Sequence, residues 1–327
     1  MRSSPRKRGR LLAAGALAGL AAAAGAVLTV EAQRREAERA FPPEGRFLTA
    51  DGVSLQYTDT EGSGEALVML HGNGAMIADL AISGLVERMA GRYRNIVFDR
   101  PGYGYSARPR GISWGAREQA RLFHDGLRKL GVERAVVFGH SWGTLVALAM
   151  AMEFPHFVSG LVLAAGYYYP ETRADAAAFS IPAIPVAGDV MRRTLAPFLP
   201  RGLAPEAIAK MFAPLPVTDR FEREFPLSLS FRPEQLRASA EELRIMNRVA
   251  EDLSEEYHRI HMPTAIVAGE ADQIVDTERH SVRLAQEIPG SRLTLLPDMG
   301  HMLHHFEVER LAAIIDGVAD GTDAPQG

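Results

Sequence analysis

Short apolar segments alternate with stretches of helical length along most of this chain, and this alternation restricts its fold more than any other feature. The apolar segments are strand candidates: Ala66–Leu70, Asn95–Phe98, Ala135–Phe138, Val158–Ala164, Thr264–Ala268 and Arg292–Leu295. The stretches between the first four include Ala116–Leu130, which carries apolar residues along one helical face. Such alternation predicts a mostly parallel sheet covered by helices on both faces.

The alternation is preceded by a hairpin signal and interrupted once. Residues 46–59, RFLTADGVSLQYTD, form two short alternating runs joined by Asp51-Gly52, which predicts a β-hairpin. Between residues 167 and 257 the alternation stops, and ten of the chain's 20 prolines lie there. That region is too long for a bare loop in a compact domain, so we expect an inserted helical subdomain.

The first 45 residues differ in composition from the rest. Residues 1–10 hold five basic side chains, and residues 11–30 run for twenty positions without a charge. As a helix this run measures about 30 Å, enough to cross the hydrocarbon core of a membrane. We expect a membrane anchor over 11–30. A signal segment cleaved near Val30-Glu31-Ala32 and an unusual helix of a soluble protein are the alternatives.

Charge and helix patterns extend this N-terminal prediction. The basic residues before the apolar run outnumber Arg34, Arg35 and Arg39 after it, which favours a cytoplasmic N-terminus and a folded domain outside the cytoplasm. Cleavage would instead release a secreted or periplasmic protein. Residues 31–45 are predicted to form a charged helical stalk ended by Pro42-Pro43. The remaining predicted parts are a core in two pieces, 46–166 and 258–319, the insertion 167–257, and a tail, 320–327.

Composition excludes several kinds of function. The chain has no cysteine, which rules out disulfides, thiolate metal sites and a cysteine nucleophile. A formal net charge of −4 provides no general basic surface for nucleic acid. We therefore expect no nucleic-acid partner. The composition does not indicate an oligomeric state.

The segment VVFGHSWGTLVALAMA, residues 136–151, places one serine between two glycines where a strand candidate meets a helix candidate. Gly139 and Gly143 permit a tight strand-to-helix turn that holds Ser141 away from the backbone. A helix that begins just after the serine directs backbone N–H groups and its positive dipole end toward a developing negative charge. Since a serine hydroxyl also needs a base to become nucleophilic, a histidine must be supplied by another segment.

Five motifs in this order resemble the α/β-hydrolase family, and the resemblance covers residues 47–316. LHGNGA (70–75) resembles the oxyanion loop, FDRPGYGYS (98–106) the segment after the next strand, and GHSWG (139–143) the nucleophile elbow. VAGEADQIVD (267–276) and LPDMGHM (296–302) resemble the acid and histidine loops. The resemblance implies an α/β fold with an eight-stranded sheet and a helical cap inserted after the sixth strand.

The resemblance also implies a catalytic triad of Ser141, Asp272 and His301, which follow the family's chain order. His301 would take the serine proton, and Asp272 would orient its imidazole ring. The oxyanion hole would use the backbone N–H groups of Asn73 and Trp142. The resemblance implies a small-molecule acyl substrate and no metal or organic cofactor. The residues expected to support the elbow and loops are Gly139, His140, Gly143, His71 and Gly72.

Other residues compete for two of these roles. Asp276 and Asp298 are alternative acids, although Asp276 is better placed to cap the next helix. His304 and His305 are expected on the helix that follows His301. Asp99 is expected to form hydrogen bonds within its own turn.

A serine at the elbow argues against haloalkane dehalogenases and epoxide hydrolases, whose family members use aspartate there. Esterases, lipases, lactonases, thioesterases, carbon–carbon bond hydrolases, perhydrolase-like enzymes and proline-releasing aminopeptidases share one triad. We expect a carboxylic-ester hydrolase for small or medium acyl groups, because residues 167–257 are apolar, aromatic and proline-rich. A proline-iminopeptidase-like aminopeptidase, a lactonase and a carbon–carbon bond hydrolase are alternatives, and a non-catalytic membrane-anchored binding protein is a more distant one.

Overall fold

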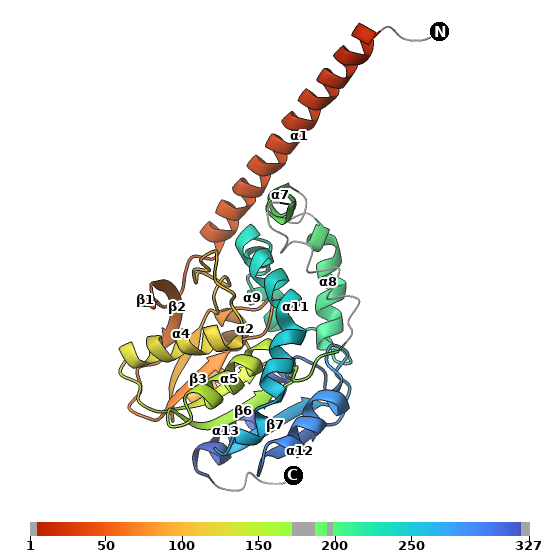
Figure 1. The fold of residues 1–327 in the computed structure, drawn as a ribbon. Coiled ribbons are helices and arrows are strands. Elements are labelled where there is room, and N and C mark those ends of the chain that lie inside the picture. The colour runs from red at the N-terminus through yellow and green to blue at the C-terminus, as the bar shows by residue number, and fades with distance from the viewer. Residues whose placement is uncertain (1–4, 172–186, 195–198, 322–327) are drawn as a thin grey trace.

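The computed structural model describes residues 5–171, 187–194 and 199–321, and within the helices it leaves out the side chains of residues 5–17, 20, 187, 199–201 and 203. Its centre is an eight-stranded sheet in the order β1-β2-β4-β3-β5-β6-β7-β8 (Figure 1). The strands are β1 (Arg46–Ala50), β2 (Val53–Asp59), β3 (Ala66–Leu70), β4 (Arg94–Phe98), β5 (Ala135–His140), β6 (Val158–Ala164), β7 (Thr264–Gly269) and β8 (Arg292–Leu296).

The six strands β3 to β8 are parallel, and only β1 and β2 pair antiparallel with their neighbours. The predicted mostly parallel sheet is confirmed. The hairpin turn lies at Asp51 and Gly52, with φ of 44° and 75°, and Ala50 pairs with Val53. Positive φ at both turn residues gives the twist that joins two antiparallel strands closely.

Helices cover both faces of the sheet, as the alternation predicts. One face carries α2 (Ile77–Ile82), α3 (Leu85–Met89) and α13 (Val308–Ala319), and the other carries α4 (Ala116–Lys129), α5 (Trp142–Glu153) and α12 (Arg283–Glu287). Adjacent residues of β3 alternate between the two cores: Leu67 and Met69 pack on the first side, Val68 and Leu70 on the second. Because both faces are buried, the inner strands read as continuous apolar runs.

The described residues between β6 and β7 contain helices and connecting segments, which we call the cap. Its helices are α7 (Ala187–Thr194), α8 (Leu199–Phe212), α9 (Asp219–Glu224), α10 (Leu227–Ser230), α11 (Pro233–Ser254) and the short 3₁₀ helix η2 (Tyr257–Arg259). Helix α11 contacts α7 and also α5, and so links the cap to the core (Figure 1). Residues 172–186 and 195–198 of the predicted insertion lie outside the described residues.

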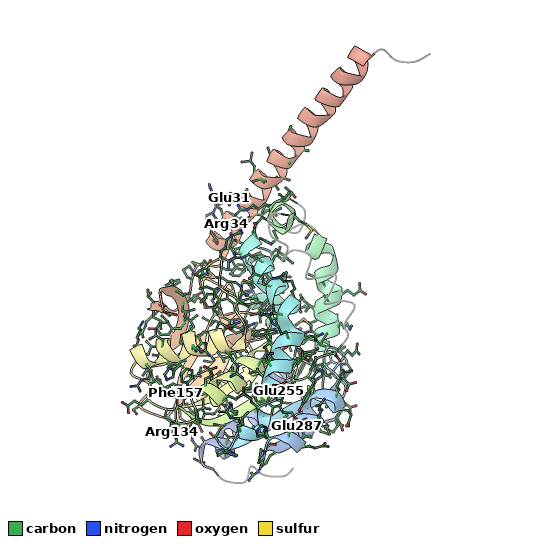
Figure 2. All side chains as sticks on the ribbon, in the orientation of Figure 1. Glu31, Arg34, Arg134, Phe157, Glu255 and Glu287 are labelled. Carbon is green, nitrogen blue, oxygen red and sulfur yellow. The ribbon has the colours of Figure 1, made fainter. Side chains whose placement is uncertain are left out.

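The N-terminal region is one helix, α1 (Pro5–Ala40), which ends before Pro42-Pro43. Its N-terminal part extends away from the domain, while its C-terminal part contacts α7 and α10 (Figure 1). Near that junction Glu31 and Arg34 form an ion pair of 2.8 Å (Figure 2). In the part of the chain that the structure describes in full, no helix combines the length and apolar character needed to cross a membrane. The span predicted over 11–30 is therefore not supported, and the side chains of residues 11–17 and 20 lie outside that part.

Candidate active site

The turn between β5 and α5 holds Ser141 in an unusual backbone conformation. Its φ is 52° and its ψ −122°, a region that residues with a Cβ adopt only under strain. The Ser141 N–H donates to the carbonyl of Ala164 on β6, and the Ser141 carbonyl accepts from the Thr144 N–H. These bonds hold the turn in place.

The two glycines of the elbow allow a close approach of backbone segments. A Cβ on Gly143 would lie 2.3 Å from the carbonyl oxygen of Leu70 on β3. A Cβ on Gly139 would lie 2.7 Å from the carbonyl oxygen of Gly143 itself. Neither distance leaves room for a methyl group, so the sharp turn requires glycine at both positions.

Three side chains named from the sequence lie in one hydrogen-bonded chain. The Oγ of Ser141 is 2.9 Å from Nε2 of His301, and Nδ1 of His301 is 2.8 Å from Oδ2 of Asp272. The side chains of His301 and Asp272 are 3% and 1% exposed. Residues 160 and 29 positions apart in the chain thus meet beyond the carboxyl ends of β5, β7 and β8.

The environment of Asp272 keeps it ionised. Burial raises the pKa of this carboxyl, but the neighbouring His301 and hydrogen bonds to the charged form outweigh it and hold the pKa below its usual range. Its Oδ1 accepts from the N–H groups of Ile274 and Val275 at 2.7 and 3.0 Å. An ionised Asp272 requires a proton on Nδ1 of His301, which leaves Nε2 free to accept the Ser141 proton.

The alternative acids are placed differently. Oδ1 of Asp276 accepts from the Arg279 N–H at 2.9 Å, at the start of the helical segment that leads into α12. Asp298 occupies the turn after β8 with a φ of 55°. The Nδ1 position of His301 is taken by Asp272.

The loop after β3 lies directly beside Ser141. A Cβ on Gly72 would be 3.0 Å from the Cβ of Ser141 and 3.5 Å from its Oγ, so glycine keeps this space open. Trp142 is the first residue of α5, and its backbone N–H therefore has no acceptor within the helix. Asn73 is the other residue expected to contribute a backbone N–H to the oxyanion hole. Its side chain contacts the cap, where its Oδ1 accepts a hydrogen bond from Ser239 Oγ at 2.6 Å.

His71 and His140 support these loops through bonds that fix their neutral forms. His71 donates from Nδ1 to the carbonyl of Gly72 at 2.8 Å and accepts at Nε2 from the Arg100 N–H at 3.0 Å. Burial and the Arg100 charge lower the pKa of His71 to about 3. His140 donates from Nε2 to the carbonyl of His301 at 3.0 Å. Burial, with the adjacent His304 and His301, holds the His140 pKa well below its usual range.

Sequence reasoning missed a buried ion pair beneath the oxyanion loop. Arg100 and Glu242 have fully buried side chains, and Arg100 Nη2 donates to Glu242 Oε2 at 3.0 Å. Arg100 also donates to the carbonyl oxygens of His71 and Gly72, at 2.8 and 3.0 Å. Tyr103 donates to the same carboxylate at 2.7 Å. The FDRPGYGYS motif drew attention to the segment of Arg100, but no local pattern marks Glu242 as its partner.

The expected hydrogen bonding of Asp99 within its own turn is confirmed, and the two histidines after His301 lie in a short helix. Asp99 accepts within its turn from the Tyr105 N–H, and in addition from the Ile77 N–H at the start of α2. His304 and His305 lie in the 3₁₀ helix η4 (Leu303–His305), which follows His301 as expected and precedes α13. Helix α13 begins only at Val308, and His304 contacts Asp79 on α2.

Comparison with known proteins agrees with this architecture. A family profile described as alpha/beta hydrolase fold matches residues 65–308. The "Haloalkane dehalogenase 2" of Mycobacterium tuberculosis is 25% identical over 285 residues, covering 84% of this chain and 94% of the relative. The "2-hydroxy-6-oxo-2,4-heptadienoate hydrolase" of Pseudomonas putida is 28% identical over 262 residues, covering 79% and 89%. The solved enol-lactonase from Burkholderia xenovorans has the same fold, with a TM-score of 0.66 at 21% identity over 84% of this chain and 98% of that one.

Proposed function

The chain belongs to the α/β-hydrolase fold family, and on this basis we propose that it is a serine hydrolase that cleaves carboxylic esters through an acyl-enzyme. The observation that carries the proposal is the hydrogen-bond chain from Ser141 through His301 to Asp272. Each neighbouring pair lies within hydrogen-bond distance, in the order that proton transfer from a serine hydroxyl requires.

In the proposed reaction Ser141 Oγ attacks the ester carbonyl while its proton moves to Nε2 of His301. The carbonyl oxygen becomes an alkoxide that accepts hydrogen bonds from the backbone N–H groups of Asn73 and Trp142. The intermediate then expels the alcohol, which takes the proton from His301. A water molecule repeats these steps on the acyl-enzyme, so that the acid is released and Ser141 regains its proton.

The identity of the nucleophile separates this proposal from the relative's dehalogenase activity. The chain has serine at position 141, whereas the dehalogenases of the family use aspartate at the elbow. A halide is displaced by a carboxylate nucleophile, while a carbonyl is attacked by an activated hydroxyl. We therefore do not extend dehalogenation to this chain.

Two acidic residues of the cap bear on the aminopeptidase alternative. Glu241 binds Arg108 at 2.7 Å and Glu242 binds Arg100 in the buried ion pair. Carboxylates held by arginines are not placed to bind the free amino group of a peptide. These two carboxylates therefore do not support a prolyl peptide as the substrate.

Carbon–carbon bond hydrolysis is a second candidate because two curated relatives from Pseudomonas putida, the heptadienoate hydrolase and a "2-hydroxymuconate semialdehyde hydrolase", carry that kind of name. The elbow sequence Ser141-Trp142-Gly143 departs from the Ser-Met-Gly-Gly of many such enzymes, which favours esters. A vinylogous 1,5-diketone in the substrate panel distinguishes the two functions.

The proposal is tested by labelling with a fluorophosphonate, which reacts with activated serines. We expect one label per chain on Ser141 and none on Ser141→Ala. A panel of p-nitrophenyl esters, lactones, prolyl amides and the diketone should then give the fastest turnover for short or medium acyl esters. Equal labelling of the alanine variant would refute the assignment of the nucleophile, and preference for another substrate class would refute the ester specificity.

We also propose that residues 11–30 hold this domain at a membrane, with the domain outside the cytoplasm. The uncharged run and the excess of basic residues before it support this proposal. Fractionation of cells expressing the full chain tests it, with protease accessibility reporting the side on which the domain lies. Recovery of the intact chain in the soluble fraction would contradict it.

A further inference from the structure

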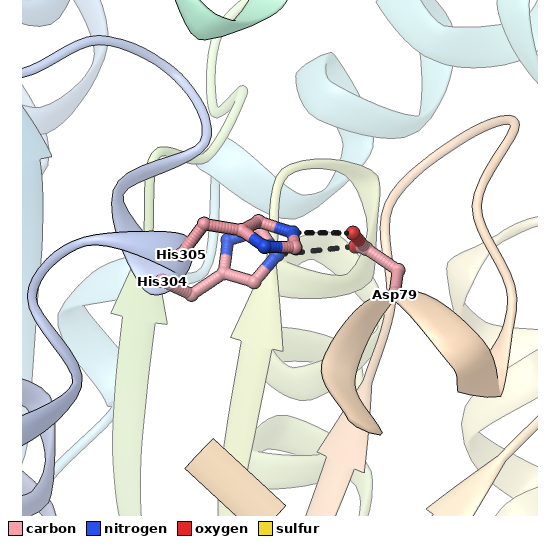
Figure 3. Close-up of side chains that lie close together, drawn as sticks. All are labelled: Asp79, His304 and His305. Atoms are coloured by element: carbon pink, nitrogen blue, oxygen red, sulfur yellow. Dashed lines mark hydrogen bonds and ion pairs between the residues drawn. The ribbon is translucent and has the colours of Figure 1, made fainter. Parts of the chain in front are cut away.

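A second carboxylate–histidine cluster lies behind the triad. Asp79 on α2 accepts two hydrogen bonds from η4: its Oδ2 from Nε2 of His304 at 3.1 Å and its Oδ1 from Nε2 of His305 at 2.9 Å (Figure 3). The side chains are 1% exposed for Asp79, 0% for His304 and 1% for His305. Each carboxylate oxygen is thus matched to one imidazole in the interior of the protein.

These three residues are also the kind that bind transition metals, with donor atoms within 4.8 Å of one another. The contacts favour hydrogen bonding, however, because the Nε2 atom of each imidazole already faces its own carboxylate oxygen at a hydrogen-bond distance. Three side chains would leave a tetrahedral ion one ligand short, and solvent has no access to complete the set. Metal binding therefore becomes an outcome of the test.

The position of His301 explains why such a cluster is needed. His301 follows the edge strand β8, yet it must reach Ser141 after β5, three strands away and so about 14 Å across the sheet. Asp272 orients the ring from β7, and His140 binds the backbone carbonyl from β5. Asp79 binds the next turn from α2, which follows β3 on the opposite side of Ser141.

Asp79 also stands close to the oxyanion loop in the chain. It lies six residues after Asn73, and His304 lies three residues after His301. One carboxylate therefore joins the segment that carries an oxyanion N–H to the segment that carries the base. The His304 ring packs against His140, with ring centroids 4.2 Å apart, so the same cluster borders the elbow.

Resting on the proposed serine-hydrolase function, we propose that Asp79 is a positioning residue: by binding His304 and His305 it fixes the turn η4 and thereby holds His301 within reach of Ser141. It acts on the geometry of the base relative to the nucleophile and the oxyanion loop. Its loss slows the chemical step more than it weakens substrate binding.

The first test is Asp79→Asn in the full chain. An amide presents only one oxygen, so one of the two imidazoles must either lose its hydrogen bond or move its proton to Nδ1 and accept the amide N–H at Nε2. Either change disturbs the paired contacts that hold η4. We expect the fluorophosphonate labelling rate and kcat to fall at least tenfold, with KM changed less than twofold. The matched control is Tyr93→Phe, which removes a part-buried hydrogen bond of 2.8 Å to Asp316 on α13 and leaves Asp79 and η4 unchanged. The control should keep the labelling rate and kcat within twofold of the wild type, even if its Tm falls as much as that of Asp79→Asn.

A second pair, His305→Gln and His305→Ala, covers the case in which Asp79→Asn does not fold. Glutamine retains an N–H donor for Asp79 and alanine does not, so the glutamine variant should label several times faster than the alanine variant. Equal rates for this pair, or wild-type kcat in folded Asp79→Asn, would overturn the proposal. One equivalent of zinc in the purified wild type, lost from His305→Ala, would replace it with a metal site. Absence of labelling in the wild type itself would instead count against the serine-hydrolase function.

Discussion

The side-chain amide of Asn73 donates a hydrogen bond of 3.1 Å to the carboxylate of Glu242, and this contact joins the oxyanion loop to cap helix α11. Glu242 also accepts a hydrogen bond from Arg100, and Arg100 in turn donates to the carbonyl oxygens of His71 and Gly72 in the same loop. The backbone on which the proposed oxyanion hole depends is therefore held by a charged group of the cap. Displacement of α11 would displace that loop.

Glu242→Gln should lower both stability and rate. It leaves the fully buried Arg100 without its counter-charge, and removal of one partner of a buried pair costs about 3–5 kcal/mol. Urea unfolding should show that loss, and kcat should fall as the loop relaxes. In the double variant Arg100→Met/Glu242→Leu no unpaired charge is left, but Tyr103, Asn73 and the carbonyls of the loop lose their partners. Stability should therefore recover only in part, while kcat stays low. Full recovery of kcat in the double variant would argue against the link between cap and loop.

Asp272→Asn should lower kcat by about 10³–10⁴-fold with little change in stability or KM. An asparagine amide can present its N–H to Nδ1 of His301, which favours the tautomer that carries its proton on Nε2 and cannot accept from Ser141. Steady-state kinetics at neutral pH on a p-nitrophenyl ester measure the effect. Asp276→Asn is the matched control, since Asp276 caps a helical segment instead of contacting His301. A loss in the control as large as in Asp272→Asn would return the acid role to Asp276.

Most of the sheet was predictable because its inner strands are buried on both faces and therefore appear in the sequence as short apolar runs. The turn at Asp51-Gly52 and the elbow at Ser141 were predictable for a similar reason: each depends on residues adjacent in the chain. Val158–Ala164 matches β6 at both ends, whereas β5 continues two residues beyond the predicted Phe138 because Gly139 and His140 stay in the ladder with β6.

The contacts that hold the site together were harder to predict. Glu242 lies 142 residues from Arg100, and Asp79 lies 225 residues from His304. In the sequence each of these carboxylates resembles any solvent-exposed charge on a helix. Its burial and its hydrogen-bond partners arise only when the cap or η4 packs in the folded protein. Their roles follow from three-dimensional packing, which periodicity does not encode.

Ser141→Gly should be more stable than Ser141→Ala by about 1 kcal/mol, although both should be inactive. The φ of 52° at position 141 strains any residue with a Cβ, and relief of such strain is worth about 1–3 kcal/mol. This outweighs the roughly 0.5–1 kcal/mol of entropy that glycine loses on folding. Urea unfolding of the two variants gives the difference. The same pair of changes at Ser291, which has no positive φ, should show the opposite order; the same order at both sites would mean that the elbow is unstrained.

The pH dependence of stability should carry a contribution from His71. In the folded protein burial and Arg100 lower its pKa to about 3, whereas an unfolded histidine titrates near 6.5. Between these values the unfolded chain binds a proton that the folded protein does not, so the free energy of unfolding falls as the pH falls from about 6.5 toward 3. One such proton gives a slope of up to about 1.4 kcal/mol per pH unit. His71→Asn, which keeps a donor for the Gly72 carbonyl but cannot titrate, should show a shallower slope between pH 6 and 4, measured by urea unfolding. Above pH 7 the two slopes should agree, because His71 is then neutral in both states. Parallel curves across the whole range would mean that His71 takes up its proton in the folded protein as readily as in the unfolded chain.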